Sequence, residues 1–227
     1  MGLTVATSPV QVRCKGILFD MDGILISSLG SVERSWTKWA NLRGVDPARA
    51  LRIVHGRRSI ESVRELRPDL DAQAENDLIE GFEIEDTEGI TVLPGVLELL
   101  RTLPHSRWTV VTSATGPLAR VRLAAGGIPV PERFVTADDV AEGKPHPAPY
   151  LAGAKLLGIA PEECVVFEDA ASGAKAGHAA GCTVIATTFS HTPESLAMAN
   201  YLVRDLTDVT AEADADGIEL RFTPVAG

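Results

Sequence analysis

Four short polar clusters along the chain carry side chains that could do chemistry together. In the first, Asp20 and Asp22 stand two residues apart, so both carboxylates could face one site, and Gly23 permits a sharp turn after them. The second cluster, Thr112 and Ser113, offers hydroxyl and backbone N–H groups just before an expected helix, which suits a phosphate oxygen. Taken singly, the first cluster also fits an acidic turn, and the second a helix cap or turn.

The other two clusters add one cation and two more carboxylates. Lys144 lies between Gly143 and Pro145, in a segment stiff enough to aim the ammonium group, although a solvated loop lysine is the alternative. Glu168 and Asp169 follow an apolar run, where burial of two unpaired carboxylates would be costly. One lysine cannot cancel the repulsion among the four acids, so a hard dication is the natural counter-charge. Oxygen ligands favour Mg²⁺ in that role.

Short apolar runs precede these clusters, and each run predicts a buried strand. The expected strands span 16–19, 108–111, 165–167 and 182–186, with a late edge strand at 218–222. Helical patterns between them occupy 96–103, 117–126, 148–158 and 172–181. Alternating strands and helices predict an α/β fold, a doubly wound parallel sheet of Rossmann-like type. Such sheets bind ligands at the carboxyl ends of their strands, so we expect the four clusters to converge on one crevice.

One stretch, residues 29–91, breaks the alternation with several helix signals and no convincing strand. Asp46 followed by Pro47 is typical of a helix start, and Asp71 could cap a helix over 72–82. We therefore expect a small inserted helical cap domain. The predicted division is a cap of residues 29–91 and a catalytic core of residues 1–28 and 92–227.

Composition and charge exclude several classes of protein. The chain has 227 residues, of which 45% are hydrophobic, enough for a sizeable core. A formal net charge of −10 at pH 7 disfavours nucleic acid or an anionic membrane surface as a partner. No stretch approaches the roughly 18 uninterrupted apolar residues of a membrane span. Cys14, Cys164 and Cys182 lack the spacing of a zinc knuckle or a disulfide framework, so we expect a cytoplasmic protein.

Taken in order, the four clusters resemble the motifs of the haloacid dehalogenase superfamily, and the resemblance extends over most of the chain. The residues that match its motifs are Asp20, Asp22, Gly23, Thr112, Lys144, Glu168 and Asp169. The position of the insertion resembles the helical cap of the subgroup that contains β-phosphoglucomutase and many sugar phosphatases. The segments that are similar to glycerol-phosphate, 2-deoxyglucose-6-phosphate and bacterial sugar or polyol phosphatases are 55–59, 135–140, 143–151 and 167–170.

The resemblance implies a role for each core residue. Asp20 would attack the phosphorus, and Asp22 would protonate the leaving oxygen and then activate water against the aspartyl-phosphate. Mg²⁺ would be held by Asp20, the carbonyl of Asp22, Asp169 and, directly or through water, Glu168. The phosphoryl oxygens would be held by Thr112, Ser113 and Lys144.

In proteins of this kind the cap would recognise the rest of the substrate and exclude water. The cap candidates are His55, Arg57, Arg58 and Trp36. The first three stand at a turn signal between helices, and Trp36 lies near the first stem of the insertion. Trp36 together with Trp39 also fits the core of a small cap, and Arg58 also fits a solvated helix charge.

The sequence therefore predicts a Mg²⁺-dependent phosphatase for small sugar or polyol phosphate monoesters, acting as a monomer or dimer. A sugar phosphomutase of the β-phosphoglucomutase type is an alternative, because it uses the same aspartyl-phosphate and passes the phosphoryl group to a sugar hydroxyl. A non-catalytic phosphate-binding regulatory protein is the alternative from another class. All the charged residues of the family motifs are present in this sequence, which argues against a non-catalytic protein.

Overall fold

The computed structural model describes residues 8–54 and 58–225, and its centre is a five-stranded parallel sheet with the order β5-β2-β6-β7-β8. The strands are β2 (Gly16–Phe19), β5 (Trp108–Val110), β6 (Cys164–Glu168), β7 (Thr183–Thr187) and β8 (Tyr201–Val203). Successive strands are added on both sides of β2, with helices in the connections. This topology confirms the predicted doubly wound α/β fold.

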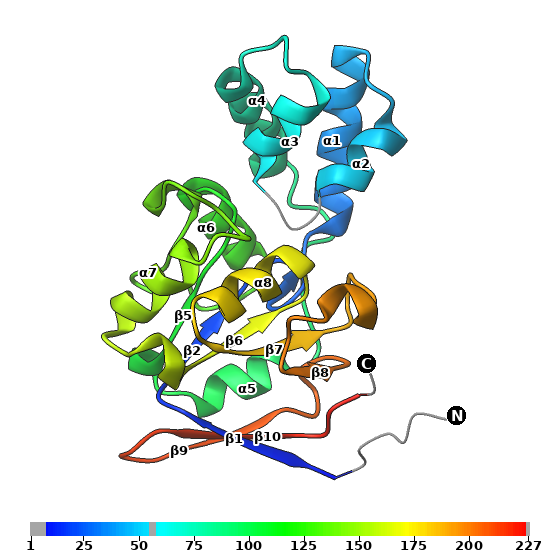
Figure 1. Ribbon diagram of the computed structural model, residues 1–227. Helices are drawn as coiled ribbons and strands as arrows, with labels where there is room; N and C mark the ends of the chain where they lie inside the picture. The colour runs from blue at the N-terminus through cyan, green and yellow to red at the C-terminus, as the bar shows by residue number, and fades with distance from the viewer. Residues whose placement is uncertain (1–7, 55–57, 226–227) are drawn as a thin grey trace.

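Helices cover both faces of this sheet (Figure 1). They are α5 (Val96–Thr102), α6 (Gly116–Ala125), α7 (Ala148–Leu157) and α8 (Ala171–Ala179). Short 3₁₀ helices are η1 (His105–Arg107), η2 (Ala137–Asp139), η3 (Pro161–Glu163) and η4 (Pro193–Leu196). Ile17 and Phe19 pack with α5 and α6, whereas Leu18 between them packs with α7 and α8. Side chains of a strand alternate between faces, so both faces of β2 must be apolar.

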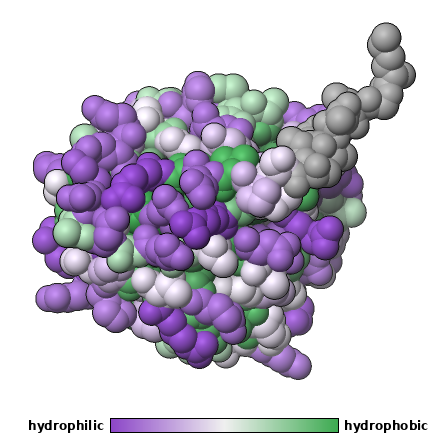
Figure 2. Space-filling model, turned by 90° about the horizontal axis from the view of Figure 1, so that it is seen from below, coloured by the Kyte–Doolittle hydropathy of each residue, from purple (hydrophilic) through white to green (hydrophobic). Residues whose placement is uncertain are grey.

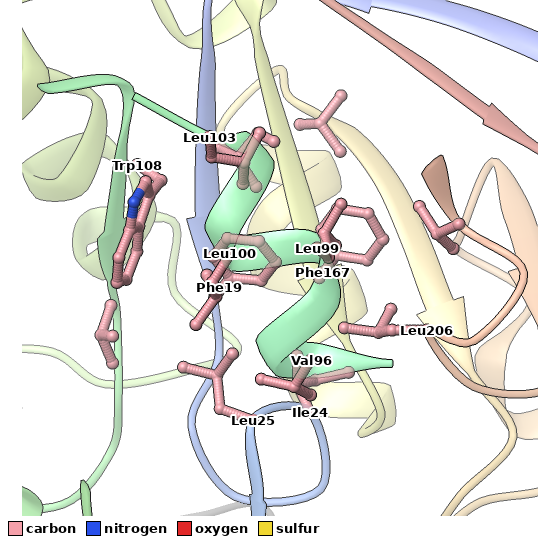
Figure 3. Packing of buried hydrophobic residues seen from close by; sticks show 14 of the residues in the cluster. Phe19, Ile24, Leu25, Val96, Leu99, Leu100, Leu103, Trp108, Phe167 and Leu206 are labelled. Atoms are coloured by element: carbon pink, nitrogen blue, oxygen red, sulfur yellow. The ribbon is translucent and has the colours of Figure 1, made fainter. Parts of the chain in front are cut away.

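The core under α5 holds the ends of β2 and β6 in place (Figure 3). Leu99 and Leu100 of α5, and Leu103 directly after it, pack in one cluster with Phe19 and Phe167, whose rings stack with centroids 5.2 Å apart. Each such buried side chain contributes roughly 1.5–3 kcal/mol to folding. Because the two stacked rings lie at or beside the last residue of their strands, this packing fixes where the polar residues that follow them emerge.

A second, antiparallel sheet of three strands lies below the core, in the order β1-β10-β9 (Figure 1). Its strands are β1 (Val10–Cys14), β9 (Thr210–Ala213) and β10 (Ile218–Phe222). The predicted strand at 218–222 is confirmed as β10, but it is not an edge strand, because it pairs on both sides in this separate sheet, with Val10 opposite Phe222. Seen from below, hydrophilic residues dominate the surface of this side, with smaller apolar areas between them (Figure 2).

Four helices gather at one end of the core, beyond the strands (Figure 1). They are α1 (Leu29–Arg43), α2 (Pro47–Val54), α3 (Ser59–Leu66) and α4 (Ala72–Glu85). The chain enters and leaves them through a two-stranded ribbon of β3 (Ile26–Ser27) and β4 (Thr91–Val92). Asp46 and Asp71 accept backbone hydrogen bonds at the starts of α2 and α4, as the sequence predicts. We therefore propose that residues 29–91 form a cap domain.

Candidate active site

The polar residues that follow β2, β5 and β6 line one cavity of about 110 Å³ between the core and the cap helices. The sequence-predicted residues that line it are Asp20, Asp22, Thr112, Ser113, Lys144, Glu168, Asp169 and Trp36. All four clusters thus lie together at the carboxyl edge of the sheet. Ser190, three residues after the end of β7, lines the same cavity and was not predicted.

Lys144 is the buried cation of the site. Its Nζ lies 2.6 Å from Oδ1 of Asp20 and 2.7 Å from Oε1 of Glu168, and it also donates to the carbonyl of Val111 at 3.1 Å. Burial opposes the charge of the ammonium group, but the two carboxylates outweigh it and raise the pKa of Lys144 above its ordinary value. Lys144 therefore stays charged and holds Asp20 in one orientation.

Glu168 supports this arrangement with both of its carboxylate oxygens. Oε1 accepts hydrogen bonds from Lys144 and from the hydroxyl of Tyr150, each at 2.7 Å. Oε2 accepts from the backbone N–H groups of Asp169 at 2.9 Å and Ala170 at 3.0 Å. Because protein groups engage both oxygens, the position of Glu168 suits a residue that orients Lys144.

The donor set fits a hard divalent cation. Carboxylate oxygens of Asp20, Glu168 and Asp169 lie within 4.8 Å of one another, and all three residues are buried. Burial together with repulsion from neighbouring carboxylates raises the pKa of Asp20 to about 7 and that of Asp169 well above its ordinary value. A bound dication would relieve this repulsion. Gly23, with φ +82°, has no side chain and so leaves space for the carboxylate of Asp169, because a Cβ at this position would lie 1.9 Å from Oδ2 of Asp169.

Asp22 is held by two side chains from different parts of the chain. The hydroxyl of Ser28 donates to its Oδ1 at 2.5 Å, and Nη1 of Arg122 donates to its Oδ2 at 3.0 Å. Nη2 of Arg122 lies 3.3 Å from Oε1 of Glu83 on α4. The guanidinium group of Arg122 thus connects an acid of the core loop to an acid of the cap.

Arg122 and Glu83 were missed because charged helix residues are usually exposed. Arg122 stands three residues after Ala119 and one before Leu123, both in the core, so helical periodicity was the signal that could have placed it on the buried face of α6. Glu83 likewise stands four residues after buried Ile79 on α4. Burial raises the pKa of Glu83 to about 7, although Arg122 opposes the shift.

Thr112 and Ser113 follow β5 and precede α6. The N–H of Thr112 donates to the carbonyl of Val135 at 2.9 Å, and its hydroxyl oxygen accepts from the N–H of Ala114 at 3.1 Å. The residue at the helix N-cap position is Thr115, so neither Thr112 nor Ser113 caps α6. Both residues line the cavity, where their polar groups can contact the oxygens of a bound anion.

The cap contributes one wall of the cavity. Trp36 lines it, and it also packs edge-on against Trp39 with ring centroids 5.3 Å apart, so it belongs to the cap core as well. His55 and Arg57, two of the predicted substrate residues, lie outside the described residues, and their role stays a prediction.

Arg58 binds the core from the start of α3. Its Nη2 donates to the carbonyls of Ala137 at 2.9 Å and Val140 at 2.7 Å, and its Nη1 donates to that of Ala141 at 3.2 Å. The guanidinium group therefore joins the cap to the loop that leads to Gly143, against which the side chain packs. A direct contact between Arg58 and a substrate stays a prediction.

A parallel sheet with buried carboxylates and a buried lysine at its carboxyl edge, covered by helices, defines the class: an α/β protein equipped for chemistry on an anionic group. The family model of haloacid dehalogenase-like hydrolases matches residues 14–181. The chain therefore belongs to this family of hydrolases, and the resemblance that the sequence indicated is confirmed.

Two phosphatases are similar to this chain over most of its length. Hexitol phosphatase A of Escherichia coli (strain K12) is 44% identical over 211 residues, which cover 91% of this chain and 98% of that protein. Glycerol-1-phosphate phosphohydrolase 2 of Saccharomyces cerevisiae is 36% identical, with 83% of this chain and 80% of that protein covered. This chain is thus similar over nearly its whole length to phosphatases of hexitol and glycerol phosphates.

Solved structures share the fold. A hydrolase from Pseudomonas syringae superposes with a TM-score of 0.75 at 24% identity, covering 86% of this chain and 95% of that one. CbbY from Rhodobacter sphaeroides in complex with phosphate gives a TM-score of 0.76 at 24% identity, with 86% and 96% covered. Over the described part of the chain, every helix is too short or too polar to cross a membrane.

Proposed function

We propose that this protein is a Mg²⁺-dependent phosphatase that hydrolyses small sugar or polyol phosphate monoesters through an aspartyl-phosphate on Asp20. The observation that carries the proposal is the position of Asp20, buried in the cavity and held by Lys144 at 2.6 Å, with Asp22 on the same loop. The identity of 44% to a hexitol phosphatase supports the class of substrate.

In the first chemical step, a carboxylate oxygen of Asp20 attacks the phosphorus while the bond from phosphorus to the ester oxygen breaks. Asp22 gives its proton to the leaving alcohol. In the second step, Asp22 takes a proton from water, the water oxygen attacks the phosphorus, and the bond to Asp20 breaks to release inorganic phosphate. Ser28 and Arg122 orient the Asp22 carboxylate for both transfers.

The phosphoryl oxygens would contact the Thr112 hydroxyl, the backbone N–H of Ser113 and the Lys144 ammonium group, which compensate charge in the transition state. Asp20, Asp169 and the backbone carbonyl of Asp22 would hold Mg²⁺. When bound, Mg²⁺ supplies positive charge that neutralises the phosphoryl oxygens and the acids.

The test is phosphate release from a panel of esters by the purified protein with Mg²⁺. The panel contains glycerol phosphate, sorbitol 6-phosphate, 2-deoxyglucose 6-phosphate and β-glucose 1-phosphate. We expect turnover of the polyol and sugar esters that stops on addition of EDTA. Turnover that persists in EDTA would overturn the metal requirement. Conversion of β-glucose 1-phosphate to glucose 6-phosphate without phosphate release, in the presence of a bisphosphate primer, would identify a mutase instead.

A further inference from the structure

A second cavity, of about 180 Å³, lies beside the first, between α4 of the cap and the start of α6. Ser59, Glu83, Ser113, Ala114 and Leu118 line both cavities. Because these residues are shared, the two cavities adjoin. A molecule whose phosphate fills the first can therefore extend into the second.

Asn76 on α4 is a buried polar side chain in the wall of this second cavity. Only 8% of its surface is exposed, and its amide forms no hydrogen bond with any residue within 8–54 or 58–225. The amide atoms of Asn76 are not among the described side-chain atoms that are fully buried without a partner, so they reach the surface of the cavity, where a ligand can contact them. The amide offers two N–H donors and an acceptor oxygen, which a ligand hydroxyl group can satisfy.

Residues at and near the start of α6 add hydrogen-bond acceptors to this cavity. The hydroxyl of Thr115 donates to Oε1 of Glu80 at 2.6 Å, which leaves the oxygen of Thr115 able to accept a hydrogen bond. The N–H of Gly116 donates to Oδ2 of Asp138 at 2.8 Å, which fixes that carboxylate at the cavity wall. The residues that line the cavity together with Asn76 therefore carry acceptor oxygens, to which hydroxyl groups of a ligand can donate.

The charge of this wall argues against a second phosphate. Glu80, Glu83 and Asp138 line the cavity, and Arg58 is the one cation among the described residues that do so. The guanidinium group of Arg58 already donates to three backbone carbonyls of the core. A phosphate placed here would meet a net negative wall and be repelled, whereas a neutral hydroxyl group would not.

We propose that this second cavity is a subsite for the hydroxyl-bearing end of a phosphate monoester, that Asn76 binds its hydroxyl groups, and that the acidic wall excludes bisphosphates. This inference rests on the proposed function, because the ester phosphate must lie at Asp20 for the rest of the molecule to reach Asn76. Asn76 is then a residue that determines specificity without taking part in the bond-breaking steps.

The test compares kcat/KM of the full chain with Mg²⁺ for sorbitol 6-phosphate, sorbitol 1,6-bisphosphate and p-nitrophenyl phosphate, which has no hydroxyl groups. We expect Asn76→Leu to lower kcat/KM for sorbitol 6-phosphate by about 10- to 100-fold and for p-nitrophenyl phosphate by less than about 2-fold. Wild-type protein should prefer sorbitol 6-phosphate to the bisphosphate by about tenfold or more. Glu85→Ala, exposed near the end of the same helix, is the matched control and should change neither value.

Each outcome bears on the proposal. Equal losses on sorbitol 6-phosphate and p-nitrophenyl phosphate, or no loss on either, would overturn the subsite while the phosphatase activity stands. Preference for the bisphosphate would overturn the exclusion of a second phosphate. Wild-type protein that releases phosphate from no ester would remove the proposed function and this inference together. If Asn76→Leu does not fold, Asn76→Ala removes the same hydrogen bonds without adding bulk, and the same ratios apply.

Discussion

The core residues and the cap helices form two walls around the adjoining cavities, and the polar side chains of these walls differ in how many partners they have within the protein. On the core wall, Lys144 contacts Asp20 and Glu168 at 2.6 and 2.7 Å, and protein donors engage both oxygens of Glu168. On the cap wall, Glu83 is buried with a more distant cation, 3.3 Å away, and Asn76 has no partner among the described residues. The acids and the lysine of the core wall thus have partners within the protein, whereas the amide of Asn76 on the cap wall is left for a ligand.

This difference has a chemical reason. The phosphoryl group is the same in every monoester, so the groups that bind it can be fixed in advance by short hydrogen bonds. The leaving alcohol differs between esters, and a wall that selects among alcohols must keep donors and acceptors free for it. We therefore expect changes on the core wall to affect every substrate and changes on the cap wall to affect only some.

The largest effect is expected on the core wall, from Asp20→Asn. This change removes the nucleophile and keeps the shape of the side chain, so phosphate release should fall by about 10⁴-fold or more on all substrates. Phosphate release measures activity, and circular dichroism controls for folding. Activity near that of the wild type would show that Asp20 is not the nucleophile.

The next effect is on stability, from Lys144→Met. Removal of the cation leaves two buried carboxylates without a counter-charge, and breaking a buried pair in this way costs about 3–5 kcal/mol. Urea unfolding in EDTA should show the loss, and Mg²⁺ should restore part of it. Lys155→Met on the exposed face of α7 is the control. Equal stability of the two variants would contradict the role given to Lys144.

On the cap wall, Glu83→Gln should change how stability depends on pH. Glu83 has its pKa raised from 4.5 to about 7 in the folded protein because it is buried. Between these pH values the folded protein keeps a proton that the unfolded chain has lost, so stability falls as pH rises from 4.5 to 7. The fall attributable to Glu83 amounts to about 3 kcal/mol at most.

Thermal unfolding in EDTA at pH 5 and pH 8 measures this effect. The wild type should lose more stability between the two pH values than Glu83→Gln, because glutamine cannot titrate. Glu85→Gln, exposed near the end of the same helix, should behave as the wild type does. Identical pH dependence in wild type and Glu83→Gln would mean that Glu83 is ionised throughout.

The smallest effect is expected from Arg58→Ala, which removes the hydrogen bonds from the cap to the loop at 137–141. Each such bond contributes roughly 0.5–1.5 kcal/mol, so KM should rise severalfold with a similar factor for every substrate. Arg64→Ala, exposed on α3, is the control. A loss confined to sorbitol 6-phosphate would show instead that Arg58 contacts the hydroxyl groups of the substrate.

Four of the five strands of the parallel sheet could be predicted because they are local apolar runs that end at polar residues, whereas β8 (Tyr201–Val203) was not predicted. The strand at 218–222 was predicted without its partners, since pairing of Val10 with Phe222 joins residues at opposite ends of the chain. Strand β1 reads Val-Gln-Val-Arg-Cys and alternates between apolar and polar residues, which is a local signal for a strand, but so short a strand is stable only with its distant partner. No local pattern identifies that partner.

The site residues likewise divide into those that a local pattern predicts and those that depend on contacts between distant parts of the chain. Asp20 and Asp169 follow strands β2 and β6, so topology brings them together, whereas Lys144 lies in the loop before α7 and meets Asp20 through packing. Arg122 meets Asp22 across 100 positions of sequence, and only the packing of α6 against the core reveals it. Asn76 could not be predicted, because an asparagine within a helix is common and its proposed partner is a hydroxyl group of the substrate, not a residue of the chain.

The most direct test of the central claim is to look for the phosphoryl group on Asp20 during turnover. The protein with Mg²⁺ is mixed with radiolabelled sorbitol 6-phosphate, quenched in acid within the first turnover, digested and mapped by mass spectrometry. We predict a phosphoryl group on the peptide that contains Asp20, removed by hydroxylamine and absent from Asp20→Asn. Full-rate phosphate release with no labelled protein, or label on Asp22 instead, would contradict the account.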